Sequence, residues 1–293
     1  MNNVLMTGAT GFVGSHLARR LVNDACKVHV ILRPSSKTNI LKNLENKITI
    51  HIHDETTEKM ISIVKKVKPD IVFHLASFSQ YKHKSEDITQ LVMSNILVGN
   101  QLVEAMVRNG VKYLINTGTY WQHFRNENYN PICLYAATKK AFEDILQFYI
   151  ETTDLRIITL KLFDTYGPMD PRPKIFSQLN DAIKKGKCLN MTLGDQLIDI
   201  VHVDDVVEAY LIAANRILAD NGFKYQEYAI SSGQQIPLKD LVETYLSTLR
   251  KDVNINWGGR EYRDREVMKP WTKGKKLPGW TPKISLEDGI CLT

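Results

Sequence analysis

Short apolar runs alternate with amphipathic stretches through the first half of the chain. The runs are rich in Val, Ile and Leu, as buried parallel strands are, and span residues 4–7, 27–32, 48–53, 71–75, 113–116 and 156–162. Helix-like stretches lie between them, near residues 12–23, 57–67, 89–109 and 136–151. This alternation predicts βαβ units, and right-handed crossovers then give an α/β fold with an open, doubly wound parallel sheet.

A glycine-rich turn separates the first apolar run from the first helix, where residues 7–14 read TGATGFVG. Gly8 permits a tight turn, Gly11 lets a ligand phosphate approach the backbone, and Gly14 lets the helix pack closely on the strand. The helix N-terminus adds unpaired N–H groups and partial positive charge. The turn is therefore a predicted site for a dinucleotide pyrophosphate. Its candidate cofactor contacts are Gly8, Gly11, Phe12, Val13 and Gly14.

The pattern changes after residues 166–168, where prolines mark a loop and residues 174–185 predict a helix. We expect residues 1–168 to form a Rossmann domain that binds the dinucleotide. Residues 169–293 are expected to form mainly a smaller, substrate-binding lobe. Segments near 198–217 and 228–231 have the character of elements that rejoin the first domain. In particular, residues 198–203 and 228–231 are expected to join its sheet.

Composition narrows the function. The chain has 293 residues, of which 43% are hydrophobic and 24% charged, as in ordinary globular proteins. We find no signal-peptide pattern and no apolar run of about 18 residues, so we expect a cytoplasmic protein without a membrane span. The four cysteines have no metal-ligand or disulfide spacing, and no metal is expected. The net charge of +6 is spread along the chain, which favours phosphate ligands over nucleic acid.

The end of the second apolar run bears on the choice of nicotinamide cofactor. NAD-binding sheets usually carry an acidic residue here, whereas this chain has Arg33. A guanidinium can bind a 2′-phosphate bidentately, and Ser36 is a further donor nearby. We therefore favour NADP(H), while an Arg33 that lies in solvent or stacks on adenine leaves NAD(H) open. Asp54 is placed either to accept a hydrogen bond from the adenine amine or to lie in an exposed turn.

Tyr135 and Lys139 are four residues apart at a predicted helix start, so they share one helix face. The helix follows the fifth strand, whose carboxyl end contains Thr117, and ligands bind at this edge of open α/β sheets. We expect the ammonium of Lys139 to lower the pKa of Tyr135, which would act as general acid or base. Lys139 would also hold the nicotinamide ribose, and Thr117 would bind the substrate oxygen. The alternatives are a packing tyrosine, a surface lysine and a strand-end threonine.

Taken in order, these motifs resemble the extended short-chain dehydrogenase/reductase superfamily, in the NAD-dependent epimerase/dehydratase branch that acts on nucleotide sugars. The resemblance covers nearly the whole chain and rests on residues 7–14, 74–76, 95, 135–139, 166–168, 199–206 and 279–282. It implies that Leu75, Ala76 and Ser77 line the cofactor site. It also implies a small C-terminal substrate domain and a homodimer formed through helices of the cofactor domain.

Departures from the family pattern favour one branch. In the 4,6-dehydratases an Asp-Glu pair follows the threonine that Thr117 resembles, whereas this chain has Gly118 and Thr119. Neither side chain transfers a proton as a carboxylate does, so dehydration is not expected. Residues 116–121 (NTGTYW) look most like the CDP-abequose and CDP-paratose synthases, which reduce a 4-keto group on a nucleotide-linked deoxyhexose.

Other departures affect the substrate diphosphate. The family often has Arg where this chain has Ile198, and Asn where it has Asp164. Arg263 resembles the family's late phosphate-binding arginine and would compensate, unless it belongs to a solvated charged loop. The candidate substrate contacts are Tyr81, Thr119, Trp121, Asp164 and Arg263.

Three functions fit these residues. The first is NADP-dependent reduction of a nucleotide-linked 4-keto-6-deoxyhexose to the 4-hydroxy sugar, with Tyr135 as general acid. The second is an NAD-dependent nucleotide-sugar 4-epimerase that uses the same three residues. The third is a regulator that binds NADP(H) without turnover. The nucleotide base, the sugar and the stereochemistry at C4 depend on loop geometry and stay open.

Overall fold

The computed structural model describes residues 1–219 and 222–293. Within these ranges the central sheet has seven strands, all parallel, in the order β11-β6-β5-β4-β1-β2-β3. The strands are β1 (Asn3–Thr7), β2 (Lys27–Leu32), β3 (Ile48–Ile52), β4 (Ile71–His74), β5 (Tyr113–Thr119), β6 (Arg156–Leu162) and β11 (Tyr225–Ile230). The strand order reverses between β1 and β4, and such a switch point opens a ligand crevice at the carboxyl edge. The predicted doubly wound α/β fold is confirmed.

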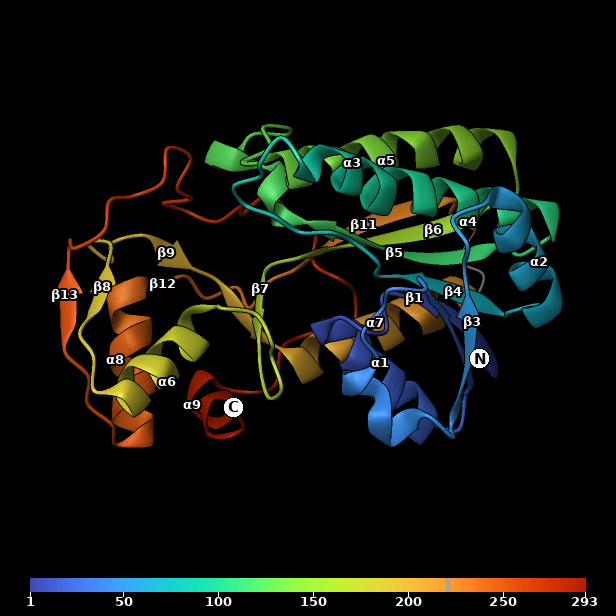
Figure 1. Ribbon diagram of the computed structural model, residues 1–293. Coiled ribbons are helices and arrows are strands. Elements are labelled where there is room, and N and C mark those ends of the chain that lie inside the picture. Colours follow the sequence, from blue (N-terminus) through green and yellow to red (C-terminus); the bar gives the residue numbers. More distant parts are fainter. Residues whose placement is uncertain (220–221) are drawn as a thin grey trace.

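Helices cover both faces of this sheet (Figure 1). On one face lie α2 (Thr57–Val67), α3 (Asp87–Val92), α4 (Val98–Arg108) and α5 (Leu134–Thr152). On the other lie α1 (Phe12–Asn23) and α7 (Val203–Leu218). Each face has its own apolar core, because parallel strands are buried on both sides. None of the helices in the described ranges is long and apolar enough to cross a membrane.

The predicted helix over 89–109 is interrupted by one π-helical turn, Met93–Leu97, between α3 and α4. This turn buries Asn95, whose side chain bonds the backbone N–H and carbonyl of Phe78 at 2.8 and 3.0 Å. The Asn95 amide also donates to the hydroxyl of Thr138 on α5 at 2.9 Å. Asn95 thus ties the loop after β4 to the helix that carries Tyr135. Short 3₁₀ turns span Asn39–Leu44, Tyr120–Gln122 and Phe124–Asn126.

A smaller lobe lies beyond the carboxyl edge of the sheet, at the left of Figure 1. Its helices are α6 (Ile175–Lys185), α8 (Leu238–Leu249) and α9 (Leu286–Cys291). Its strands are β8 (Leu189–Met191), β9 (Leu197–Ile198), β12 (Ile236–Pro237) and β13 (Ile255–Trp257). They form two-stranded pairs, β8 with β13 and β9 with β12, around a separate apolar core.

The chain returns to the main sheet after this lobe begins to form, first through α7 and β11 and again at residues 275–280, where Lys276 bridges Ala229 of β11 and Trp280 joins the core on one face of the sheet. As expected for 228–231, β11 adds to the sheet edge beside β6, and α7 packs on the same sheet. The expectation for 198–203 is wrong, because β10 (Ile200–His202) pairs with β7 (Asp164–Tyr166) in a separate two-stranded sheet. The physical reason is that β11 occupies the edge of β6, which leaves β10 no open strand there.

Candidate active site

The glycine turn is packed so tightly that side chains do not fit. Gly8 has a φ of +77°, and a Cβ on it would lie 2.5 Å from the backbone of Leu75 and Ala76. A Cβ on Gly14 would lie 2.1 Å from the carbonyl oxygen of Gly8. The N–H of Gly11 closes the turn on that same oxygen at 2.9 Å. The turn therefore brings the start of α1 and the loop after β4 together at the crevice.

Buried polar groups beside this turn have no partner within the described part of the chain. The Nδ1 of His74 bonds the hydroxyl of Thr7 at 2.8 Å, whereas its Nε2 is buried and unpaired. The Nζ of Lys139 is also buried and unpaired. Burial lowers the pKa of Lys139 to about 8, although the charge of Glu143 opposes this effect. Burial, with the charge of Lys139, lowers the pKa of His74 to about 3.

Buried donors without partners are costly, so these atoms indicate where ligand hydroxyls belong. A nicotinamide ribose offers such hydroxyls, and the glycine turn offers N–H groups to a pyrophosphate. The residues present therefore fit a dinucleotide. Of the other predicted cofactor contacts, Val13, Leu75 and Ala76 are half-buried and Ser77 is exposed.

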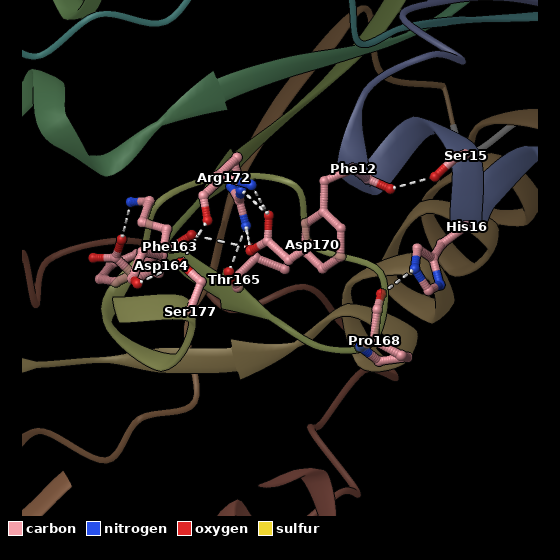
Figure 2. Close-up of polar contacts among 11 residues, drawn as sticks. Phe12, Ser15, His16, Phe163, Asp164, Thr165, Pro168, Asp170, Arg172 and Ser177 are labelled. Carbon is pink, nitrogen blue, oxygen red and sulfur yellow. Dashed lines mark hydrogen bonds and ion pairs between the residues drawn. The ribbon is translucent and has the colours of Figure 1, made fainter. Parts of the chain in front are cut away.

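A cation that the sequence analysis missed lies beside Phe12, the first residue of α1. The guanidinium of Arg172 is 4.6 Å from the centre of the Phe12 ring. It donates to both carboxylate oxygens of Asp170 and to the carbonyl of Thr165, each at 2.7 Å (Figure 2). Its charge also opposes the rise that burial causes in the pKa of Tyr135. The sequence feature that could have indicated this cation is the position of Arg172 between two prolines, Pro171 and Pro173.

The three candidate catalytic residues come from two elements that meet at the crevice. Thr117 lies in β5, which continues to Thr119 because residues 117–119 pair with β6. Tyr135 and Lys139 occupy the first two turns of α5. The hydroxyl of Thr117 is 2.6 Å from the hydroxyl of Tyr210, a fully buried residue of α7. Burial raises the pKa of Tyr210, and its hydrogen bond with Thr117 opposes this rise.

The phenol of Tyr135 does not have the lowered pKa that we expected from Lys139. Burial raises its pKa well above the ordinary value, and the nearby Cys133 adds to this, while a hydrogen bond with Ser77 and the charge of Arg172 oppose it. Desolvation of the phenolate is the largest of these effects. The phenol of Tyr135 is therefore protonated at neutral pH, as a general acid must be.

The end of β2 presents a cation rather than a carboxylate. Arg33 is exposed just after the strand. Its backbone N–H donates to the hydroxyl of Ser36 at 3.0 Å. Asp54, past β3, is exposed and accepts from the N–H and hydroxyl of Thr56 at 3.1 and 2.7 Å. These bonds lower the pKa of Asp54, whose carboxylate thus shapes the turn before α2.

Three candidate substrate contacts form a series that starts at Tyr135. The rings of Tyr135 and Trp121 are 6.1 Å apart, and those of Trp121 and Tyr81 are 5.7 Å apart, both edge to face. The guanidinium of Arg263 lies 4.2 Å from the centre of the Tyr81 ring. A cationic group therefore stands at the far end of an aromatic wall, an arrangement suited to a ring linked to a phosphate.

The other two candidate substrate contacts are engaged within the protein. The carboxylate of Asp164 accepts from the hydroxyl of Tyr120 at 2.8 Å and from Lys174 Nζ at 2.9 Å. Burial alone would raise the pKa of Asp164, but the charge and hydrogen bonds of these partners lower it. Thr119 is buried, and its hydroxyl accepts from the N–H of Trp121 at 3.3 Å. Both residues thus shape the wall of the site.

This parallel sheet, with its glycine turn at the strand-order reversal, defines a dinucleotide-binding protein of the Rossmann class. Residues 4–230 match the NAD dependent epimerase/dehydratase family, and the chain belongs to that family. A CDP-abequose synthase from Salmonella muenchen is 27% identical over 292 residues, which cover 98% of this chain and 95% of that protein. The resemblance inferred from the motifs is therefore confirmed.

Solved structures agree with this assignment. The UDP-glucose 4-epimerase of Thermotoga maritima, solved with UDP-glucose, has a TM-score of 0.84 at 26% identity and covers 100% of this chain and 97% of its own. The UDP-glucose 4-epimerase of Stenotrophomonas maltophila, solved with bound NAD and formylated UDP-arabinopyranose, has a TM-score of 0.87. It is 20% identical and covers 100% of this chain and 97% of its own, and at this identity the similarity shows the fold alone.

Proposed function

We propose that this protein reduces the 4-keto group of a nucleotide-linked 4-keto-6-deoxyhexose to a hydroxyl, with NADPH as reductant. The observation that carries the proposal is the pair of residues after Thr117. A Cβ on Gly118 would lie 2.9 Å from Glu143 Oε1, within the packed interior, and the hydroxyl of Thr119 caps the next turn. Neither position offers a carboxylate for proton transfer at the sugar, so carbonyl chemistry without dehydration fits best.

Each candidate catalytic side chain has a distinct task in this reaction. When bound, the reduced nicotinamide ring supplies a hydride, which forms the new C–H bond at C4. Tyr135 donates its phenolic proton to the carbonyl oxygen and later regains a proton from solvent. Thr117 donates a hydrogen bond to the same oxygen and so stabilises the negative charge that develops there. Lys139 holds the ribose hydroxyls, and its ammonium favours the phenolate that Tyr135 leaves behind.

The choice of NADPH rests on the exposed cation after β2. The Arg33 guanidinium suits a dianionic 2′-phosphate, and the carboxylate that usually accepts ribose hydroxyls in NAD sites is absent from the end of β2. We expect Arg33→Asp to lower kcat/KM for NADPH by roughly 10- to 100-fold, because it removes one or two charged hydrogen bonds to the 2′-phosphate. Turnover with NADH should be unchanged or improved. Lys251→Asp, an exposed control in the small lobe, should change neither value. Equal losses with both cofactors would refute the preference.

A nucleotide-sugar 4-epimerase remains the second candidate, favoured by the 26% identity to the Thermotoga maritima enzyme over the full chain. The two reactions differ in what happens to the cofactor. A reductase consumes one NADPH for each sugar, whereas an epimerase oxidises and re-reduces the same carbon with no net change. Incubation with CDP-4-keto-6-deoxyglucose and NADPH, followed at the nicotinamide absorbance band, separates them. Loss of absorbance supports the reductase, and an unchanged cofactor with an inverted product supports the epimerase.

We further propose that the enzyme is a cytoplasmic homodimer. The dimer proposal is supported by large apolar side chains exposed on the outer surface of α3 and α5, namely Ile88, Val92 and Phe148 at 46, 44 and 62%. The cytoplasmic proposal is supported by four cysteines that are all unpaired, which suits a reducing compartment. Light scattering should give twice the mass of 33.5 kDa, and Phe148→Glu should halve it. A wild-type monomer would refute the dimer.

A further inference from the structure

Tyr210 places a hydroxyl group on an otherwise apolar helix face. Its neighbours on the buried side of α7 are Val206, Val207, Ala213 and Ala214, which pack against the sheet. The side chain is fully excluded from solvent, and its ring lies 6.3 Å from that of Phe73 on β4. Packing alone would be satisfied by phenylalanine. A buried phenol on an apolar surface is costly unless its hydroxyl has a partner, and here the partner is Thr117.

The direction of this hydrogen bond follows from the acidity of its two hydroxyls. Both hydroxyls have a proton to donate across this 2.6 Å contact, and the greater acidity of a phenol favours Tyr210 as the donor and Thr117 Oγ1 as the acceptor. The proton of Thr117 is then directed away from Tyr210. A hydroxyl that accepts one hydrogen bond also becomes a stronger donor of the next. The ring of Trp121, two residues past the end of β5, lies 6.1 Å from that of Tyr135, so the carboxyl end of β5, where Thr117 lies, is close to the phenol that faces the reacting carbonyl.

We propose that Tyr210 is a positioning residue, which fixes the rotation of the Thr117 hydroxyl and directs its proton toward the substrate carbonyl oxygen. The inference rests on the proposed role of Thr117 in holding that oxygen. It applies equally to reduction of a 4-keto sugar and to epimerisation at C4, because both place the same oxygen between Thr117 and Tyr135. Tyr210 does not touch the substrate itself, and it acts through Thr117.

The test is a double-mutant cycle with Tyr210→Phe and Thr117→Val, measured as kcat and KM on the sugar substrate. We expect Tyr210→Phe to lower kcat about tenfold, with KM for the sugar and NADPH binding each within twofold. This loss is smaller than the 100- to 1000-fold cost of deleting a transition-state donor outright, which we expect from Thr117→Val. In the Thr117→Val background, Tyr210→Phe should change kcat by less than twofold, because the hydroxyl that it orients is gone.

Two controls separate positioning from stability. Tyr228→Phe also removes a buried phenol, which donates to Gln226 on the same strand, β11, and it should leave kcat unchanged. Thr117→Ser keeps the hydroxyl, and Tyr210→Phe should again lower kcat in that background. Circular dichroism and thermal melts of each variant establish that it is folded.

The possible outcomes distinguish this inference from the proposed function. An unchanged kcat in Tyr210→Phe, or an equal loss with and without Thr117, overturns the positioning role. If the wild type epimerises its substrate with no net cofactor oxidation, the reductase proposal fails while the cycle still tests Tyr210. If the wild type turns over no nucleotide sugar, both fail, because Thr117 then has no substrate oxygen to hold.

Discussion

Two lysines are almost fully buried in the described part of this protein, and they have opposite surroundings. Lys139 is 1% exposed and Lys161 is 2% exposed. The Nζ of Lys161 is 3.0 Å from a carboxylate oxygen of Glu227, 3.7 Å from one of Glu143, and 2.9 Å from His123 Nε2. By contrast, the Nζ of Lys139 has no hydrogen-bond partner among the described residues.

The difference teaches how to separate a structural charge from a functional one. A buried charge is tolerated when carboxylates pair with it, and Lys161 meets this condition within its own chain. Lys139 does not, and its lowered pKa expresses the cost of burial. Folding alone gives no reason to keep an ammonium at that position. We infer that Lys139 is kept for a ligand and Lys161 for the packing of β5, β6 and α5.

The largest expected effect comes from removal of the unpaired lysine. Lys139→Met should lower kcat/KM by about 1000-fold, because the ribose and the Tyr135 phenolate both lose their cation. The variant should melt at or above the wild-type temperature, since an unpaired buried charge is gone. Lys140→Met, the neighbouring position on α5, is the matched control and should keep full activity. If Lys139→Met keeps activity within tenfold of wild type, Lys139 does not have the functional role that distinguishes it from Lys161.

The paired lysine should show the reverse pattern. Lys161→Met leaves the carboxylates of Glu143 and Glu227 without their cation, and we expect it to lower the free energy of unfolding by about 3–5 kcal/mol in urea titrations. The variant that remains folded should turn over within threefold of wild type. Lys112→Met breaks an exposed pair with Asp154 and should cost less than about 1 kcal/mol. A similarly small loss for Lys161→Met would refute its structural role.

A smaller effect should appear in the pH dependence of stability. The pKa of Lys139 is about 8 in the folded protein, against 10.5 for an unperturbed lysine. Between pH 8 and 10.5 Lys139 binds more protons in the unfolded state than in the folded state. Its contribution therefore makes the free energy of unfolding rise with pH. The stability of wild type relative to Lys139→Met should therefore increase by up to about 3 kcal/mol from pH 8 to 10.5. A constant difference in unfolding free energy across this range would show that the ammonium is not destabilised by burial.

The sequence predicted the first lobe well because local signals and tertiary packing agree there. The bounds of β2, β6, α1 and α2 match the apolar periodicity, and the glycines of residues 7–14 mark the turn. The path of 198–203 was not predictable, because short strands carry little periodicity and the free edge of β6 depends on β11. Local patterns do not report such competition between distant segments.

Site residues could be predicted where their spacing along the chain fixes their geometry. They could not be predicted where their position depends on contacts between segments that are distant in the sequence. Tyr135 and Lys139 share a helix face by their spacing alone. Tyr210 lies 93 residues from Thr117, and its hydrogen bond exists only through the packing of α7 on the sheet. Its signal was a lone phenol in an apolar helix stripe. The pKa of Tyr135 was misjudged because desolvation depends on the whole surrounding fold, which no local motif encodes.

The central proposal is that a hydride passes from NADPH to C4 of the sugar, with net oxidation of the cofactor. It is tested most directly with NADPH that carries deuterium at C4 of the nicotinamide, on the face from which the enzyme takes hydride, and with mass spectrometry of the purified product. The account predicts one deuterium at C4 of the product sugar and one oxidised cofactor for each sugar converted. A product without deuterium, formed while the cofactor stays reduced, would contradict it.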